Sequence, residues 1–187
     1  MYPPEQSSAA AFAFAHVRCD LIRNASFVQT LAHARANRLI SPDVTMTPLS
    51  SQAIHEYSTQ WNHPHWTGAG GWPWALLAHR YTRKPRGFHA ALWSEQRLCG
   101  LCVGRVSKGR KHLTLHYMES APDPIHPLRG LVTLLMFEAA RNYGLAMGAG
   151  KLLLRDPLPG VAARYETFGF RLAPSSSGLI YFERTLG

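Results

Sequence analysis

Arg129 and Gly130 are the residues whose types and spacing most clearly suggest chemistry. They follow a proline-rich link, Pro122 to Pro127, and open a segment with helical periodicity. The first turn of a helix leaves backbone N–H groups unpaired and carries partial positive charge, so it attracts phosphates. Gly130 would let the backbone approach a ligand because it has no Cβ, and Arg129 would add a charge-assisted contact. The pattern predicts a pyrophosphate site; an ordinary amphipathic helix with a glycine in its first turn is the alternative.

Two other groups of residues have spacings that suggest metal or redox chemistry. Cys99 and Cys102 are three residues apart in a strand-like stretch, where residues at that separation point to opposite faces. His63 and His65 form a second pair, but two histidines without a nearby cysteine or acidic partner are a weak signal. We therefore predict no metal site and no redox pair.

The composition sets limits on the architecture. The chain has 187 residues, of which 46% are hydrophobic and 17% charged, a size that suits one globular domain plus an appendage. Ala9 to Ala15 is the longest apolar candidate, and it is too short for a membrane span. No basic segment precedes it, so it makes a poor secretory signal, and we expect a cytoplasmic protein without membrane contact.

The charge balance predicts anionic partners. Lysine and arginine total 20 against 11 acidic residues, which gives a formal net charge of +9. Two basic clusters stand out, one over residues 80–86 and the other over residues 105–111. They favour polyanions or phosphate-bearing ligands, including nucleic acid. A merely solvated basic surface is the alternative.

The elements that must position these residues follow from periodicity and turn signals. Residues 1–42 are expected to form an N-terminal extension, with about eight loose residues and a helix from Phe27 to Arg38, and residues 43–187 the main domain. The later elements are expected in the order strand Val44 to Pro48, a helix around Ile54 to Trp61, helix Trp74 to Tyr81, strands Phe88 to Trp93, Arg97 to Ser107 and His112 to Glu119, a helix from Arg129-Gly130 that Gly144 caps, strand Lys151 to Leu154, helix Gly160 to Thr167 and strand Leu179 to Thr185. This order predicts an α+β fold with one mostly antiparallel sheet flanked by helices.

The run Arg164-Tyr165-Glu166-Thr167-Phe168-Gly169-Phe170 resembles the Tyr-Glu-x-x-Gly-Phe signature of the GNAT superfamily of acyl-CoA-dependent N-acetyltransferases. The resemblance covers about Val44 to Leu186 and includes the order of the elements. It implies a GNAT-like fold in which an acceptor amine attacks acetyl-CoA directly, with no cysteine intermediate. The loop departs from the family pattern Gln/Arg-x-x-Gly-x-Gly/Ala, because Pro127 and Val132 stand where a basic or amide residue and a small residue are usual.

The resemblance also implies roles for individual residues. Pantetheine would lie between the strands His112 to Glu119 and Lys151 to Leu154, and the hydroxyl of Tyr165 would protonate the departing thiolate. Glu119 is the first candidate for the general base and His116 the second. The residues implied in cofactor binding are Tyr117, Met118, Arg129, Gly130, Leu131, Val132 and Thr133. A packed Tyr165 and a solvated Glu119 at a strand end are the plainer alternatives.

Tryptophans around a glycine-rich loop complete the expected site. Trp66, Trp72 and Trp74 are expected to bind the acceptor, an unknown amine that is acidic or bears phosphate; tryptophans that fill the core are an equal alternative. The degenerate phosphate loop also motivates a second functional hypothesis. In it, the chain is a non-catalytic GNAT-like module whose basic, aromatic surface binds nucleic acid or a protein partner.

Overall fold

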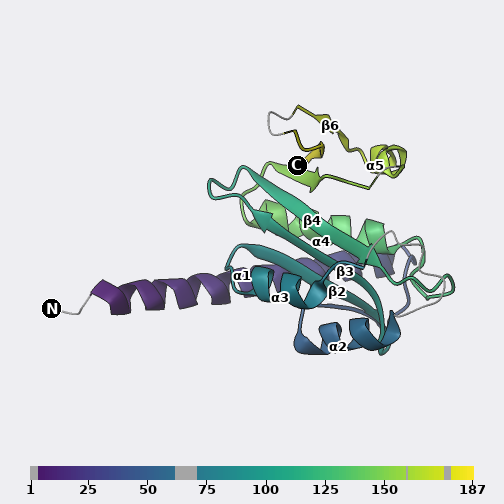
Figure 1. Ribbon diagram of the computed structural model, residues 1–187, viewed down its shortest axis with the longest axis horizontal. Coiled ribbons are helices and arrows are strands. Elements are labelled where there is room, and N and C mark those ends of the chain that lie inside the picture. The colour runs from purple at the N-terminus through teal and green to yellow at the C-terminus, as the bar shows by residue number, and fades with distance from the viewer. Residues whose placement is uncertain (1–3, 62–70, 159, 175–177) are drawn as a thin grey trace.

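Seven strands form one sheet in the order β1-β2-β3-β4-β5-β7-β6 (Figure 1). A computed structural model of the protein describes residues 4–61, 71–158, 160–174 and 178–187. The strands are β1 Val44–Thr47, β2 Gly87–Ser94, β3 Arg97–Val106, β4 His112–Ser120, β5 Lys151–Arg155, β6 Arg171–Ala173 and β7 Tyr181–Thr185. Neighbouring strands are antiparallel except β4 and β5, which are parallel. The predicted α+β class with a mostly antiparallel sheet is confirmed.

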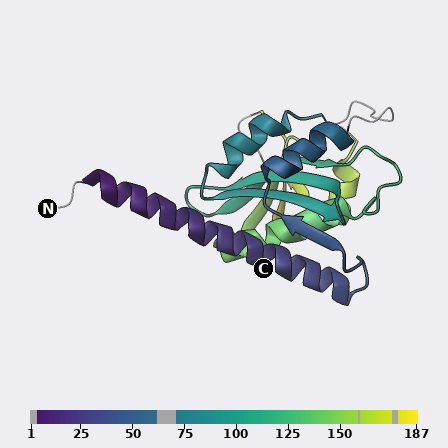
Figure 2. The same cartoon turned by 90° about the horizontal axis from the view of Figure 1, so that it is seen from below.

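Helices cover both faces of the sheet, with α1 and α4 on one side and α2 and α3 on the other (Figure 2). The helices are α1 Pro4–Ala36, α2 Ser51–Gln60, α3 Trp74–Thr82, α4 Val132–Ala146 and α5 Ala162–Thr167. The strand β2 shows why both faces are covered: Phe88 and Leu92 join one apolar core, whereas Ala91 and Trp93 join the other. Alternation along a strand sends successive side chains to opposite faces. The middle of the sheet is therefore buried on both sides.

The first helix is much longer than the sequence predicts. It begins at Pro4 rather than near Phe27, and its N-terminal half projects from the body of the molecule (Figures 1 and 2). The expectation of eight loose residues is wrong for the described residues from Pro4 onward. The reason is that the projecting half has no buried face and so no apolar periodicity, while its alanine-rich composition favours helix throughout.

The C-terminal half of α1 is fixed to the body by buried contacts. Phe27 and Leu31 belong to the core. The guanidinium of Arg23 donates to the carbonyl of Gly87 at 2.7 Å and lies 5.7 Å from the ring centre of Tyr143. Arg23 is only 1% exposed. The helix is thus half structural core and half free projection.

The end of α4 also differs from the prediction. Gly144 lies inside the helix, and the left-handed residue that follows the helix is Gly148, with φ of +84°. Gly144 is needed for packing instead, because a Cβ there would meet the side chain of Leu186 at 3.0 Å. The predicted cap at Gly144 is therefore wrong by one helical turn.

A bulge in β3 overturns the prediction for the two cysteines. Leu92 is opposite Gly100 and Trp93 is opposite Leu98, so Cys99 is an extra residue in the ladder. Cys99 and Cys102 consequently belong to the same core rather than to opposite faces. Both thiols are free and buried, and burial raises the pKa of both, which keeps them protonated.

Parallel pairing between β4 and β5 covers only part of β4. It runs from His112 opposite Lys151 to Leu115 opposite Leu154. Beyond Leu115, β4 continues to Ser120 and pairs with β3 alone. One backbone edge of β4 is thus left open at the point where the two strands part.

Candidate active site

The parting of β4 and β5 creates a narrow cleft of about 70 Å³. Its walls come from residues 115–118 of β4, residues 154–158 at and after the end of β5, Trp72 and Tyr165. The cleft therefore brings together five residues that the sequence analysis singled out: Trp72, His116, Tyr117, Met118 and Tyr165. They come from three separate parts of the chain.

Tyr165 stands at the cleft with a free hydroxyl. Its ring, carried by α5, packs against Phe137, Phe170 and Phe182, with ring centres 5.8, 6.5 and 6.4 Å away. The hydroxyl makes no hydrogen bond to any residue that the structure describes. Burial raises the pKa of Tyr165, although the nearby charge of Arg164 opposes the shift. The phenol is therefore protonated at neutral pH and has a proton to give.

His116 reaches the cleft because a second bulge interrupts the ladder. Val103 is opposite Tyr117 and Gly104 is opposite Leu115, so His116 is the extra residue of β4. Its ring centre lies 5.5 Å from that of Tyr81. Its Nδ1 is buried and has no hydrogen-bond partner within the described part of the chain.

The surroundings of His116 keep its imidazole neutral. Burial lowers its pKa to about 4, and the positive charges of Arg155, Arg80, Arg105 and Lys84 contribute to this lowering. At neutral pH the ring therefore has an unprotonated nitrogen that can accept a proton. The same four cations make this side of the cleft attractive to an anion.

Glu119 occupies a different environment from the one that the sequence suggests. It is 8% exposed, so it is not a solvated strand end. One carboxylate oxygen accepts the N–H of Gly71 at 2.8 Å, and the other accepts the indole N–H of Trp74 at 2.7 Å. Burial raises the pKa of Glu119, and these two hydrogen bonds oppose the shift. Glu119 does not line the cleft that holds Tyr165.

Some of the tryptophans fill the core, and one lines the cleft, where it could contact an acceptor. Trp74 is fully buried, and Trp61 is buried with its indole N–H 3.1 Å from the carbonyl of Leu98. Trp72 lines the cleft, and its ring centre lies 5.0 Å from that of Tyr117. Trp66, His63 and His65 lie outside the described residues.

A separate hollow of about 300 Å³ lies at the start of α4. Arg129, Gly130, Val132 and Thr133 line it, while Leu131 packs against the core. The helix begins at Val132, two residues later than predicted, and no side chain caps it. Gly130 has φ of +84°, and a Cβ built there would meet no atom within 4 Å, so the backbone lies open to a ligand.

Two arginines stand beside this hollow. Arg129 donates to the carbonyl of Pro124 at 2.6 Å, and Arg164 reaches the carbonyl of Gly130 at 3.5 Å. Arg164 was not predicted as a site residue, although its place beside Tyr165 on one short helix was a usable signal. Arg155 was not predicted either, because nothing in the local sequence shows that the end of β5 faces His116.

Clusters of histidine, cysteine and acidic residues that could hold a metal ion are absent from the ranges described above. In those same ranges, no helix is both long and apolar enough to cross a membrane.

Comparison with known proteins gives a match in structure only. No protein-family model matches the sequence, and no curated protein matches it. The ribosomal-protein-S18-alanine N-acetyltransferase from Escherichia coli is 18% identical, with a TM-score of 0.57 over 77% of this chain and 94% of that protein. An acetyltransferase from Thermus thermophilus is 19% identical, with a TM-score of 0.57 over 77% of this chain and 97% of that protein.

A third similar structure contains coenzyme A. PaiA N-acetyltransferase from Thermoplasma acidophilum, in complex with coenzyme A, is 12% identical, with a TM-score of 0.53 over 78% of this chain and 99% of that protein. At these identities the likeness establishes the fold and nothing finer. Together with the parted β4 and β5 strands, it shows that this chain has the fold of the GNAT superfamily of acetyltransferases.

Proposed function

We propose that the protein is an acetyl-CoA-dependent N-acetyltransferase in which an acceptor amine attacks the thioester directly. The observation that carries the proposal is the cleft between β4 and β5, which has a free phenol and an unprotonated imidazole in its walls. Bound acetyl-CoA would supply an activated acyl group. Neither Cys99 nor Cys102 takes part, because both are buried and protonated.

The described residues fit this donor at two points. The open backbone edge of β4 at Tyr117 and Met118 offers hydrogen-bonding groups to the amides of the pantetheine arm. The hollow at α4 offers the first-turn N–H groups and the charges of Arg129 and Arg164 to the pyrophosphate. Pro127 has no N–H of its own, but it precedes α4, and Val132 keeps its N–H, so the donors of the first turn remain.

The residues of the cleft can account for both proton transfers. An alkylamine has a pKa near 10.4 in water and must lose a proton before it attacks. The neutral amine then attacks, and its nitrogen becomes acidic as the C–N bond forms. His116, which lines the same cleft as Tyr165, accepts the proton that this nitrogen releases, whereas both oxygens of Glu119 are already hydrogen-bonded. We therefore place His116 ahead of Glu119 as the base. As the new C–N bond forms and the C–S bond breaks, Tyr165 donates its proton to the sulfur.

Calorimetric titration of the full chain with acetyl-CoA tests the proposal. We expect a dissociation constant of order ~10 μM, equivalent to roughly −7 kcal/mol. An assay for free thiol, run with a panel of amines, then measures turnover. A chain that binds no acetyl-CoA at millimolar concentration would overturn the proposal.

The degenerate phosphate loop keeps a non-catalytic binding module as a second candidate. Arg129 bonds to the carbonyl of Pro124 rather than extending freely into the hollow, which weakens the case for a pyrophosphate ligand there. Absence of acetyl-CoA binding together with retained binding of an anionic partner would favour this candidate.

A further inference from the structure

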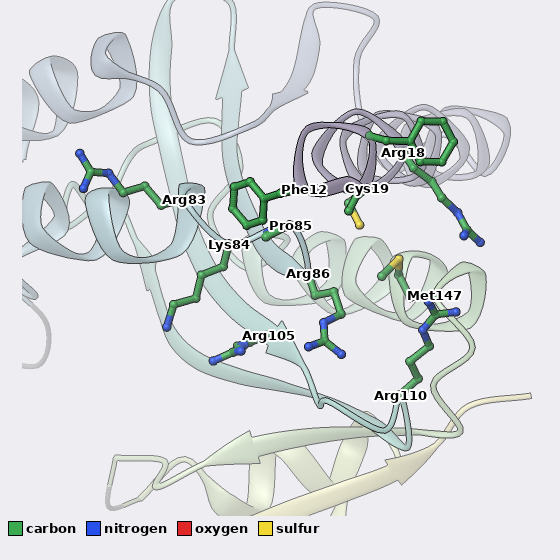
Figure 3. A pocket seen from close by; sticks show the side chains of 12 residues that line it. Phe12, Arg18, Cys19, Arg83, Lys84, Pro85, Arg86, Arg105, Arg110 and Met147 are labelled. Atoms are coloured by element: carbon green, nitrogen blue, oxygen red, sulfur yellow. The ribbon is translucent and has the colours of Figure 1, made fainter. Parts of the chain in front are cut away.

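A hollow of about 530 Å³ lies between the projecting half of α1 and the main domain, apart from the cleft and the α4 hollow (Figure 3). Its walls come from α1, the loop between α3 and β2, β3, the hairpin between β3 and β4, and the residue after α4. The volume suits a specific ligand, since pockets of roughly 300–1,000 Å³ are typical of such sites.

The walls of this hollow are strongly basic. Six cations line it, and no acidic residue does: Arg18, Arg83, Lys84, Arg86, Arg105 and Arg110. None of the six forms an ion pair with an acidic residue whose side chain the structure describes. Figure 3 shows Arg86 and Arg110 in the space between α1 and the hairpin. Lys84 and Arg105 lie beside Arg86, nearer to α3. Cations that surround a concave surface without acidic partners attract an anion.

Aromatic surface accompanies the positive charge. Phe12 and Phe14 also line the hollow and are 54% and 71% exposed, which is unusual for rings of this size. In Figure 3 the Phe12 ring reaches from α1 toward the loop that holds Pro85. A flat ring beside arginine side chains suits a ligand that combines negative charge with aromatic bases.

Some cations of the hollow also act on the cleft. Lys84 and Arg105 line the hollow, and their charges contribute to the lowered pKa of His116. Arg80 and Arg155 act on the same imidazole, so eight cations in all line the hollow or act on His116. We call these eight residues the basic belt: Arg18, Arg80, Arg83, Lys84, Arg86, Arg105, Arg110 and Arg155. They carry more positive charge than one mononucleotide can balance, which favours a ligand with several phosphates.

We propose that the hollow and the basic belt bind a single strand of nucleic acid, with phosphates on the belt and an unpaired base on Phe12. In a duplex each base face is already stacked on a neighbouring base pair, so a single strand fits the exposed rings better. An acidic polypeptide would match the charge without using the rings. Binding requires no acetyl-CoA, so the inference stands apart from the proposed acyl transfer.

Fluorescence anisotropy with a labelled 20-nucleotide single-stranded RNA tests the proposal on the full chain without acetyl-CoA. We expect binding that weakens steeply between 50 and 200 mM salt. For single strands, the slope of log K against log salt is about −0.7 for each phosphate neutralised. Arg105→Ala should make the slope less steep by about 0.7. Arg171→Ala removes one exposed cation from β6, at the far edge of the sheet, and should leave the slope unchanged.

The aromatic contact has its own matched pair of variants. Phe12→Leu should weaken binding by about tenfold, at the lower end of what loss of one stacked base costs, whereas Phe12→Tyr should retain it. Circular dichroism verifies that each variant keeps the fold. The proposal is wrong if RNA binding is insensitive to salt, if Arg171→Ala weakens it as much as Arg105→Ala does, or if Phe12→Leu has no effect.

Competition experiments separate the other ligand classes. Unlabelled duplex RNA, ATP, polyglutamate and vesicles with an anionic phospholipid are each added to the RNA complex. Weaker competition by all four than by unlabelled single strand supports the proposal. Equal or stronger competition by any one of them overturns it and assigns the hollow to that class.

Discussion

The cleft between β4 and β5 and the hollow beneath α1 handle charge in opposite ways. In the cleft, burial shifts His116 and Tyr165 toward their neutral forms, which are the forms that the proposed acyl transfer requires. Around the hollow, the basic side chains lack acidic partners among the described side chains. The contrast shows that one small domain can place partly buried, neutral groups close to solvent-exposed cations. The charges of the cations then shift the pKa of a partly buried group such as His116.

Removal of the proton donor tests the cleft most severely. Tyr165→Phe keeps the ring and its packing but deletes the hydroxyl, so we expect turnover to fall about 10²- to 10⁴-fold, the usual value of one positioned acid. Affinity for acetyl-CoA, measured by calorimetry, should stay within about twofold. An equal loss of both, or no loss of either, excludes Tyr165 as the acid.

Replacement of the base tests which buried group accepts the proton. His116→Gln should lower kcat by about 10²-fold. Wild-type activity should also fall as the pH drops through about 4, where His116 becomes protonated, and this decline should vanish in the variant.

The matched control for this prediction is Glu119→Gln. It alters the contacts to Gly71 and Trp74, so we expect a lower melting temperature but less than about a tenfold loss of kcat. A larger loss from Glu119→Gln than from His116→Gln would restore Glu119 as the base.

The pH dependence of stability gives a related test of burial. The pKa of His116 is about 4 in the folded chain and near 6.5 when unfolded, so the unfolded state binds more protons between these values. Stability should therefore fall as the pH is lowered from 6.5 toward 4. Urea titrations at several pH values should show a smaller fall for His116→Gln than for the wild type.

Loss of an exposed cation at the α4 hollow should have a modest effect. Arg164→Ala should raise the dissociation constant of acetyl-CoA about threefold to fivefold, because backbone N–H groups remain. Arg141→Ala, on α4 but outside that hollow, is the control. If Arg164→Ala abolishes binding, the side chain rather than the backbone holds the pyrophosphate.

The smallest effect should come from Arg155, a residue of the basic belt that also lines the cleft. Arg155→Gln removes one of the charges that lower the pKa of His116, so the acidic decline in activity should move to higher pH. High salt should reduce the difference between variant and wild type, since salt screens exposed charges. A decline that stays at the same pH would show that the charge of Arg155 does not contribute to the low pKa of His116.

Most of the helices and strands were predictable because each leaves a regular pattern of apolar residues in the local sequence. The meander of β2, β3 and β4, the helix that follows it and the strand β5 each have a buried face, and a buried face leaves a regular apolar pattern. The projecting half of α1 has no such face, so periodicity missed it. The cytoplasmic location and the domain boundary after residue 42 stay predictions.

Features of the site that depend on contacts between distant segments were not predictable. The bulges at Cys99 and His116 depend on how neighbouring strands pair, and one of them reversed the orientation expected for a cysteine. The hydrogen bonds that bury Glu119 come from residues 45 or more positions away. The resemblance to the GNAT superfamily identified Tyr165 and His116 as candidates, but only the fold shows that they share a cleft while Glu119 lies outside it.

The anchor at Arg23 divides α1 into a portion that the domain requires and a portion that can vary. Without this guanidinium, the Gly87 carbonyl and the Tyr143 ring would lose their cationic partner inside the core. Residues 8–18, by contrast, contribute no buried side chain. Substitutions in this arm should therefore cost little folding free energy, so that related chains could acquire new partners there while the main domain stays unchanged.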